Sequence, residues 1–208
     1  MSRGVFISFE GGEGTGKSTQ SSLLCTRLEN QGKQVIQTRE PGGTPGAEEI
    51  RNLLVSGNPD NWSPVAEALL VSAARDDHLR RCINPALNDG KFVICDRFID
   101  STWAYQGAAG GVDHELLKTL ETHVVSKNVP DLTLVFDLDP EIGLARAIDR
   151  GQKEDRFEAK GLDFHKNIRK AFLDIANKYP KRCMVVDASL SLEDIETQVW
   201  QIVSDRFL

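Results

Sequence analysis

The sequence predicts an α/β protein in which helices cover both faces of a five-stranded parallel sheet. Five short apolar runs are rich in β-branched or aromatic residues, and such nearly continuous apolarity is typical of strands buried on both faces. These runs are Val5–Phe9, Val35–Thr38, Phe92–Cys95, Leu132–Leu138 and Met184–Val186. The segments between them have helical spacing, and strands that alternate with helices form right-handed βαβ units.

Four of the intervening segments carry the clearest helical spacing. Their apolar positions are Leu23, Leu24 and Leu28; Leu116, Leu117, Leu120 and Val124; Ile142, Ala145 and Ile148; and Ile195, Val199, Ile202 and Val203. A helix is also expected to begin between Glu48 and Arg51. The stretch from Arg150 to Lys170 is crowded with charge, and composition alone favours a mobile lid and a solvated helical face equally.

Length and composition set the class of protein. The 208 residues correspond to one domain, residues 1–208, and 40% hydrophobic residues argue against disorder. A net charge of −6 makes the chain a poor non-specific binder of nucleic acid or of anionic membranes. We find no long apolar run and no signal peptide, and the four cysteines are far apart. We therefore expect a cytoplasmic protein with free thiols and with neither nucleic acid nor membrane as a partner.

The first predicted strand is followed by a complete phosphate-binding loop. Residues Gly11, Gly12, Glu13, Gly14, Thr15, Gly16, Lys17 and Ser18 fit the pattern GxxxxGK[ST], and an apolar-periodic helix follows. Its glycines let backbone N–H groups surround an anion, and the N-terminus of the helix adds partial positive charge. Lys17 is expected to reach the β- and γ-phosphates, and the Ser18 hydroxyl to ligate Mg²⁺. The loop predicts a protein that binds a nucleoside triphosphate.

Charged residues also follow the second and third strands, and ligands of parallel sheets bind outside the carboxyl ends of the strands. Arg51 is a candidate clamp for an anion or a base. Arg97 is suited to an acceptor phosphate, since Arg forms paired hydrogen bonds with phosphate oxygens. Asp96 resembles a carboxylate that organises Mg²⁺ through water, and Asp137 after the fourth strand is its rival. Ser101–Gly107 supplies hydroxyl, amide and aromatic groups that are typical of base and sugar readers.

The chain length and the absence of certain motifs exclude two classes of nucleoside triphosphate-binding protein. A switch GTPase needs a guanine-reading NKxD segment, and the Asp is missing because Pro180 follows Asn177-Lys178-Tyr179. A large motor ATPase needs a longer chain. A small kinase that phosphorylates another phosphate or a hydroxyl group fits.

Together these segments closely resemble the thymidylate kinase family, whose members phosphorylate dTMP. The resemblance rests on Phe9–Gly11 with Gly16–Thr19, Thr38–Thr44, Ala73–Arg75, Asp96–Phe98 with Ala104–Gly107, and Pro130–Leu134 with Asp155–Glu158. It implies a P-loop nucleoside monophosphate kinase fold with a small lid at about 148–162. It also implies direct in-line transfer from ATP-Mg²⁺ to dTMP for dTTP biosynthesis, and a homodimer joined through helices.

The resemblance also implies roles for single residues. Lys17 and the loop through Thr19 would hold the ATP phosphates, with Ser18 and Asp96 at the metal. Arg97 resembles the clamp on the acceptor phosphate, and Glu13 the acidic residue near the sugar 3′-hydroxyl. Arg75 and Gln106 resemble the readers of the thymine edge, and Tyr105 the residue that disfavours a ribose 2′-hydroxyl. The remaining pocket residues implied are Glu40, Pro41, Arg51, Val71 and Thr102.

The lid expectation follows from a division within the family. Some members carry an Arg in the phosphate loop, whereas bacterial members without it supply cations from the lid. Here Gly14 follows Glu13, so Arg150 and Arg156 are the expected lid cations. Positive charge near the transferred phosphoryl group can be worth about 10³-fold in rate.

One position departs from the family pattern. Many members stack a Phe on thymine four residues before the Arg that aligns with Arg75, and this chain has Val71 there, followed by Ser72. A base–aromatic stack is worth about 1–3 kcal/mol, so weaker dTMP binding or tolerance of dUMP is expected. The alternative functions are a kinase of another nucleoside monophosphate, such as dUMP or dCMP, and a non-catalytic nucleotide-sensing protein.

Overall fold

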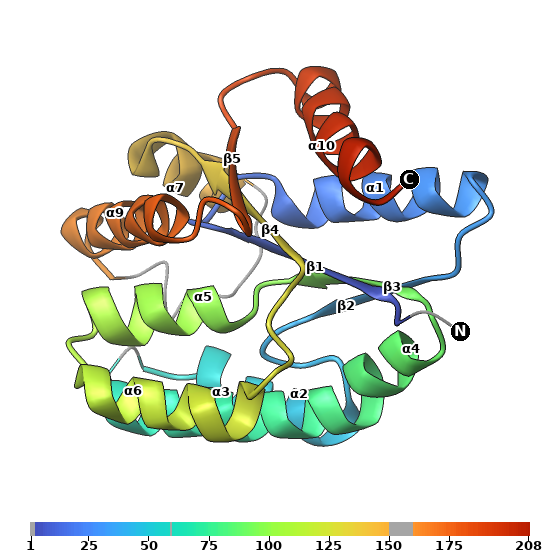
Figure 1. Cartoon of the computed structure of the whole chain (residues 1–208). Helices are drawn as coiled ribbons and strands as arrows, with labels where there is room; N and C mark the ends of the chain where they lie inside the picture. Colours follow the sequence, from blue (N-terminus) through green and yellow to red (C-terminus); the bar gives the residue numbers. More distant parts are fainter. Residues whose placement is uncertain (1–2, 59, 150–159) are drawn as a thin grey trace.

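Five parallel strands form one sheet in the computed structural model, which describes residues 3–58, 60–149 and 160–208. The strands are β1 (Val5–Gly11), β2 (Val35–Arg39), β3 (Phe92–Asp96), β4 (Leu132–Asp137) and β5 (Cys183–Asp187). Their order in the sheet is β2-β3-β1-β4-β5, as Figure 1 shows. The predicted fold class and all five predicted strands are confirmed, with ends that differ by one or two residues.

Helices cover both faces of this sheet (Figure 1). The α-helices are α1 (Lys17–Asn30), α2 (Pro45–Val55), α3 (Pro64–His78), α4 (Asn84–Asn88), α5 (Ile99–Thr102), α6 (His114–Leu120), α7 (Pro140–Asp149), α9 (Leu162–Lys178) and α10 (Leu192–Phe207). Three π-helical segments, η1 (Leu79–Ile83), η2 (Trp103–Ala109) and η3 (Glu121–Val125), continue α3, α5 and α6. None of the helices described is long and apolar enough to cross a bilayer.

The two faces of the sheet have separate cores because side chains alternate along a strand. Ile7 and Phe9 of β1 pack with apolar residues of α1 and α10 on one face. Phe6 points to the other face, where it joins the core of η1 and α4. On that same face, β4 and β5 pack against α9 and η2.

The expectation that every strand is buried on both faces is wrong for the two edge strands. β1, β3 and β4 are almost wholly buried, whereas Met184 and Val185 of β5 are 39% and 43% exposed. β2 is also only partly buried. An edge strand has one strand neighbour, so the covering helices shield it less completely.

The helix predicted around Ile142, Ala145 and Ile148 is present as α7, and one predicted helix start needs correction. The face of Ile142 and Ile148 on α7 is exposed and contributes little to the core. Helix α2 begins at Pro45, before the expected Glu48, because proline is favoured in the first turn of a helix. The apolar faces of α1 and α10 are buried as predicted.

The topology places a ligand site at the carboxyl end of β1. The sheet grows from β1 toward β3 and β2 on one side and toward β4 and β5 on the other, so the strand order reverses there. Open parallel sheets bind ligands at such a switch point. The loop that follows β1 needs glycine at Gly14, where φ is +69° and a Cβ would collide with the Gly143 backbone.

Candidate active site

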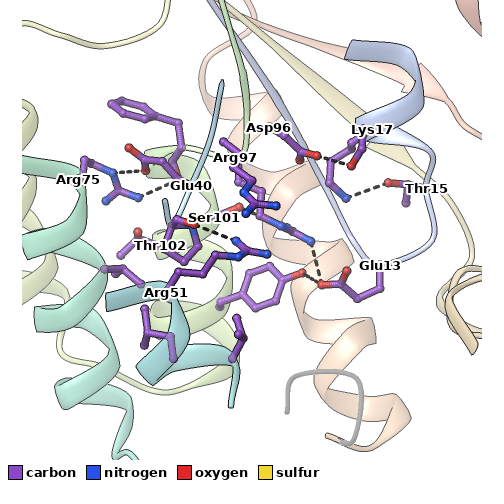
Figure 2. Close-up of a pocket in the computed structure, with 18 of the residues that line it drawn as sticks. Glu13, Thr15, Lys17, Glu40, Arg51, Arg75, Asp96, Arg97, Ser101 and Thr102 are labelled. Carbon is purple, nitrogen blue, oxygen red and sulfur yellow. Dashed lines mark hydrogen bonds and ion pairs between the residues drawn. The ribbon is translucent and has the colours of Figure 1, made fainter. Parts of the chain in front are cut away.

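A cleft of about 560 Å³ lies where the loops after β1, β2 and β3 meet. Figure 2 shows Lys17 and Asp96 on one side of it and Arg75 and Glu40 on the other, with Arg97 between them. All the residues predicted to bind the substrate line this cleft: Glu13, Glu40, Pro41, Arg51, Val71, Arg75, Arg97, Thr102, Tyr105 and Gln106. Residues scattered between positions 13 and 106 therefore face one volume.

The phosphate loop supplies one wall of the cleft. Residues Glu13, Gly14, Thr15, Gly16, Lys17 and Ser18 line it, whereas Gly11, Gly12 and Thr19 do not. Gly12 faces a second, small hollow, and Thr19 is an exposed residue of α1. Arg150 and Arg156, the predicted lid cations, lie outside the described residues.

Lys17 lies in the first turn of α1 and points back into the loop. Its Nζ donates hydrogen bonds to Gly12 O at 2.6 Å and to Thr15 Oγ1 at 3.1 Å. Burial, aided by the Arg97 guanidinium, lowers the pKa of Lys17 to about 8, although nearby carboxylates oppose this shift. Together with the N-terminus of α1, the side chain forms a cationic cradle suited to phosphate.

Ser18 and Asp96 meet at the edge of this cradle. Ser18 Oγ donates a hydrogen bond to Asp96 Oδ2 at 2.5 Å. Asp137, the rival carboxylate, instead accepts two hydrogen bonds from Arg169, at 2.6 and 3.0 Å. Hydroxyl and carboxylate oxygens suit Mg²⁺, which retains several waters and phosphate ligands. The geometry favours Asp96 over Asp137 as the carboxylate beside the metal. The described residues contain no cluster of three His, Cys, Asp or Glu that could hold a metal ion.

Arg97 and Glu13 form an ion pair in the middle of the cleft. Arg97 Nη2 and Tyr105 Oη both donate to Glu13 Oε1 at 2.8 Å. Burial alone would raise the pKa of Glu13, but Arg97 and Lys17 lower it to about 2. Arg97 Nη1 donates to Gly11 O at 3.0 Å, and its guanidinium lies 5.0 Å from the Tyr105 ring centroid. Arg97 therefore holds a permanent positive charge beside the phosphate loop.

Glu10 is a site residue that the sequence analysis missed. It is fully buried at the end of β1, and its Oε1 accepts a hydrogen bond from the Phe98 N–H at 2.7 Å. Its Oε2 accepts one from Ser101 Oγ at 2.6 Å. Arg97 lies between the end of β3 and Phe98, and its φ of 68° is unusual for a residue other than glycine. Glu10 thus fixes the backbone that carries Arg97.

Burial gives Glu10 unusual acid–base behaviour. Desolvation, together with the charge of Asp100, raises the pKa of Glu10 to about 8. The only signal in the sequence was a carboxylate at the end of an apolar strand, directly before the phosphate loop.

A second buried ion pair closes the other end of the cleft. Arg75 Nε donates to Glu40 Oε2 at 2.7 Å, and Arg75 Nη2 donates to Phe98 O at 3.1 Å. His78 Nδ1 lies 3.1 Å from Glu40 Oε1. Burial acts to lower the pKa of His78, but hydrogen bonds with Cys82 and Glu40 raise it to about 9. Arg75 is therefore held rigidly with part of its guanidinium toward the cleft.

Further contacts shape the same end. Arg51 Nη1 donates to Pro41 O at 2.8 Å, which joins α2 to the loop after β2. Val71 faces the cleft, whereas Ser72 is buried and donates a hydrogen bond to Ala68 O. The lining residues to which the sequence analysis gave no role are Arg39, Leu54, Val55, Phe98 and Ala147.

Comparisons with known proteins show which family this chain resembles. A family model described as thymidylate kinase matches residues 9–199. The thymidylate kinase of Caulobacter vibrioides is 53% identical over 206 residues, which cover 99% of each chain. That of Bradyrhizobium sp. strain BTAi1 is 48% identical, over 98% of this chain and 91% of the relative. A solved structure of thymidylate kinase from Ehrlichia chaffeensis superposes with a TM-score of 0.80 at 34% identity, over 97% of this chain and 99% of that chain.

The raised pKa of Glu10 predicts a pH-dependent stability. Between its ordinary pKa of 4.5 and its folded-state value of about 8, the unfolded chain has lost the proton and the folded chain keeps it. Raising the pH through this range therefore destabilises the wild-type protein, by up to about 1.4 kcal/mol per pH unit. The Glu10→Gln variant keeps a neutral hydrogen-bonding group there, so it should gain stability relative to wild type as the pH rises.

Urea unfolding of both proteins at pH 5, 6.5 and 8 measures this gain. Glu49→Gln, on the exposed surface of α2, is the matched control and should show no such trend. Parallel stability curves for wild type and Glu10→Gln would show that Glu10 is ionised throughout this range.

Proposed function

The chain belongs to the thymidylate kinase family, and we propose that its cleft transfers the γ-phosphoryl group of ATP directly to the phosphate of dTMP. The family assignment makes it an enzyme that phosphorylates dTMP with ATP, in the biosynthesis of dTTP. One observation carries the proposed geometry: the phosphate loop with Lys17 and the guanidinium of Arg97 line the same cleft. Transfer of a phosphoryl group from one phosphate to another requires two phosphate-binding groups close together.

The phosphate loop would hold the donor. Its backbone N–H groups, the N-terminus of α1 and the Lys17 ammonium group belong to one short segment of the chain, and together they suit the phosphates of ATP. Binding of ATP replaces the hydrogen bonds of Lys17 Nζ to Gly12 and Thr15 with bonds to phosphate oxygens. This part of the cleft fixes the donor without covalent chemistry.

Mg²⁺ fits the donor side, because Ser18 Oγ and Asp96 Oδ2 are oxygen donors beside the loop. Ser18 would ligate the ion directly, and Asp96 would orient its bound water. When bound, Mg²⁺ neutralises charge on the phosphate oxygens. Asp96 also keeps the Ser18 hydroxyl directed toward this position.

The acceptor would lie between Arg97 and Arg75. Arg97 can form paired hydrogen bonds with the dTMP phosphate, and Glu13 and Tyr105 lie where the sugar would follow. The base would then enter the end lined by Arg51, Val71, Arg75 and Gln106, with Glu40, Pro41 and Thr102 around it. Positioning and positive charge lower the barrier, since the transition state of phosphoryl transfer is loose and anionic.

The lid belongs to this proposal. The chain would act as one domain, residues 1–208, in which the segment at about 148–162 closes over the nucleotides. Arg150 and Arg156 would bring cations to the transferred group, which suits a phosphate loop that carries Gly14 instead of an arginine. Both arginines lie outside the described residues.

We also propose a cytoplasmic homodimer. Leu53, Val65 and Leu69, on the adjacent helices α2 and α3, are 51%, 43% and 50% exposed. Exposed large apolar side chains on neighbouring helices favour association with a second copy.

Initial rates of ADP formation with dTMP, dUMP, dCMP and dGMP test the substrate assignment. We expect dTMP to have the highest kcat/KM, which would mean that the aliphatic Val71 suffices in the base pocket. The Arg97→Lys variant should lose about 100-fold or more in kcat/KM for dTMP, because lysine cannot form the paired hydrogen bonds.

Arg27→Lys is the matched control and should behave like wild type, because Arg27 pairs with Glu196 of α10 and does not line the cleft. Equal or better rates with another monophosphate would retain the kinase mechanism and overturn the base assignment. An unchanged kcat/KM in Arg97→Lys would overturn the role of Arg97.

The Mg²⁺ dependence of the rate separates the two candidate carboxylates. Asp96→Asn should raise the Mg²⁺ concentration needed for half-maximal rate by about tenfold or more, since it weakens the water shell of the ion. Asp137→Asn, which breaks only the pair with Arg169, should change this concentration by less than about twofold. The opposite ranking of the two variants would move the metal site to Asp137.

A further inference from the structure

Gln106 enters the cleft with its amide already held by a carboxylate. It lies on η2 and is 3% exposed, and its Nε2 donates a hydrogen bond to Glu67 Oε2 at 3.0 Å. Glu67 lies in the first turn of α3 and is 2% exposed. The Gln106 backbone is also fixed, because Val112 N–H donates to Gln106 O at 2.9 Å.

An ionised carboxylate determines which way the Gln106 amide faces. Such a group accepts hydrogen bonds only, so the amide nitrogen must face it. Lys160 Nζ lies 3.7 Å from Glu67 Oε1 and provides a positive charge beside this carboxylate. If the Gln106 amide were turned over, its oxygen would face a carboxylate oxygen, and two buried acceptors would repel each other. The oxygen Oε1 of Gln106 is therefore the amide atom left for a ligand.

Arg75 presents the opposite polarity in the same cleft. Its hydrogen bonds to described residues, Glu40 and Phe98, use two of its five N–H donors. Glu67, Val71 and Arg75 are four residues apart on α3, so they share one face of the helix. The cleft thus offers a ligand an oxygen acceptor from Gln106 and N–H donors from Arg75.

We propose that Glu67 is a specificity-determining residue, because it fixes the Gln106 amide so that the cleft accepts a pyrimidine with an N–H at position 3. Uracil and thymine present N3–H beside the O4 carbonyl, which matches an acceptor beside a donor. Cytosine presents a bare N3 beside an amino group and is mismatched at both positions. This inference rests on the proposed function, since it assumes a nucleoside monophosphate whose base lies at this end of the cleft.

The ratio of kcat/KM for dUMP to kcat/KM for dCMP tests the proposal, because these substrates differ only at the N3 and C4 edge. In Glu67→Gln, the residue at position 67 can donate or accept, so the Gln106 amide is free to turn and donate to N3 of cytosine. We expect the ratio to fall about tenfold or more from its wild-type value. The mismatch at Arg75 remains, so dCMP should not become the better substrate.

A double variant provides the rescue. Glu67→Gln combined with Gln106→Glu exchanges the amide and the carboxylate, and an oxygen acceptor again faces the base. The ratio should return to within about threefold of wild type. Glu49→Gln, exposed on α2, is the matched charge control and should leave the ratio unchanged. Thermal unfolding of each variant checks its fold, and the double variant carries the test if Glu67→Gln alone does not fold.

The outcomes distinguish this inference from the proposed function. If Glu67→Gln lowers kcat/KM for dUMP and dCMP by the same factor, Glu67 has only a structural role and the inference is overturned. The same holds if the double variant keeps a ratio reduced about tenfold or more. If wild type neither binds nor phosphorylates dTMP, the proposed function fails and this inference fails with it.

Discussion

The buried carboxyl group of Glu10 is the interaction on which the rest of the site depends. β1 ends at the phosphate loop, β3 ends at Asp96 directly before Arg97, and Glu10 ties the two ends together through the Phe98 N–H and the Ser101 hydroxyl. Arg97 adopts a left-handed backbone conformation that costs free energy, so the surrounding contacts must hold it there. Its guanidinium consequently lies beside Gly11 and Glu13. The acceptor clamp and the donor loop are therefore built as one unit.

Charge is concentrated in this cleft although the whole chain carries a net charge of −6. Arg97 and Lys17 stabilise the ionised form of Glu13 and lower its pKa to about 2, whereas burial next to Arg97 lowers the pKa of Lys17 to about 8. Arg75 forms an ion pair with Glu40, as Arg97 does with Glu13. Arg97 and Arg75 thus each have a carboxylate partner that holds the guanidinium in place. This arrangement is suited to a reaction whose transition state carries spread negative charge, because little reorganisation is needed when the substrates bind.

Much of the fold and part of the site could be predicted from the sequence, because both depend on patterns within short segments of the chain. Buried strands are recognised as apolar runs, and the phosphate loop is recognised as one continuous motif that binds phosphate. The partial exposure of β2 and β5 could not be predicted, since apolarity does not reveal which strand lies at an edge. Glu10 and Glu67 were missed for a related reason. Their partners, Ser101 and Gln106, are distant in sequence, so only the folded chain brings each pair together.

The most direct test of this account is a double-mutant cycle between Glu10 and Arg97, measured as kcat/KM for dTMP. If Glu10 acts by positioning Arg97, Glu10→Ala should lower kcat/KM by about tenfold or more in the wild-type protein. In the Arg97→Lys background the same substitution should cost little further. If the two losses multiply instead, Glu10 and Arg97 contribute independently, and the claim that one buried carboxyl group organises the site is wrong.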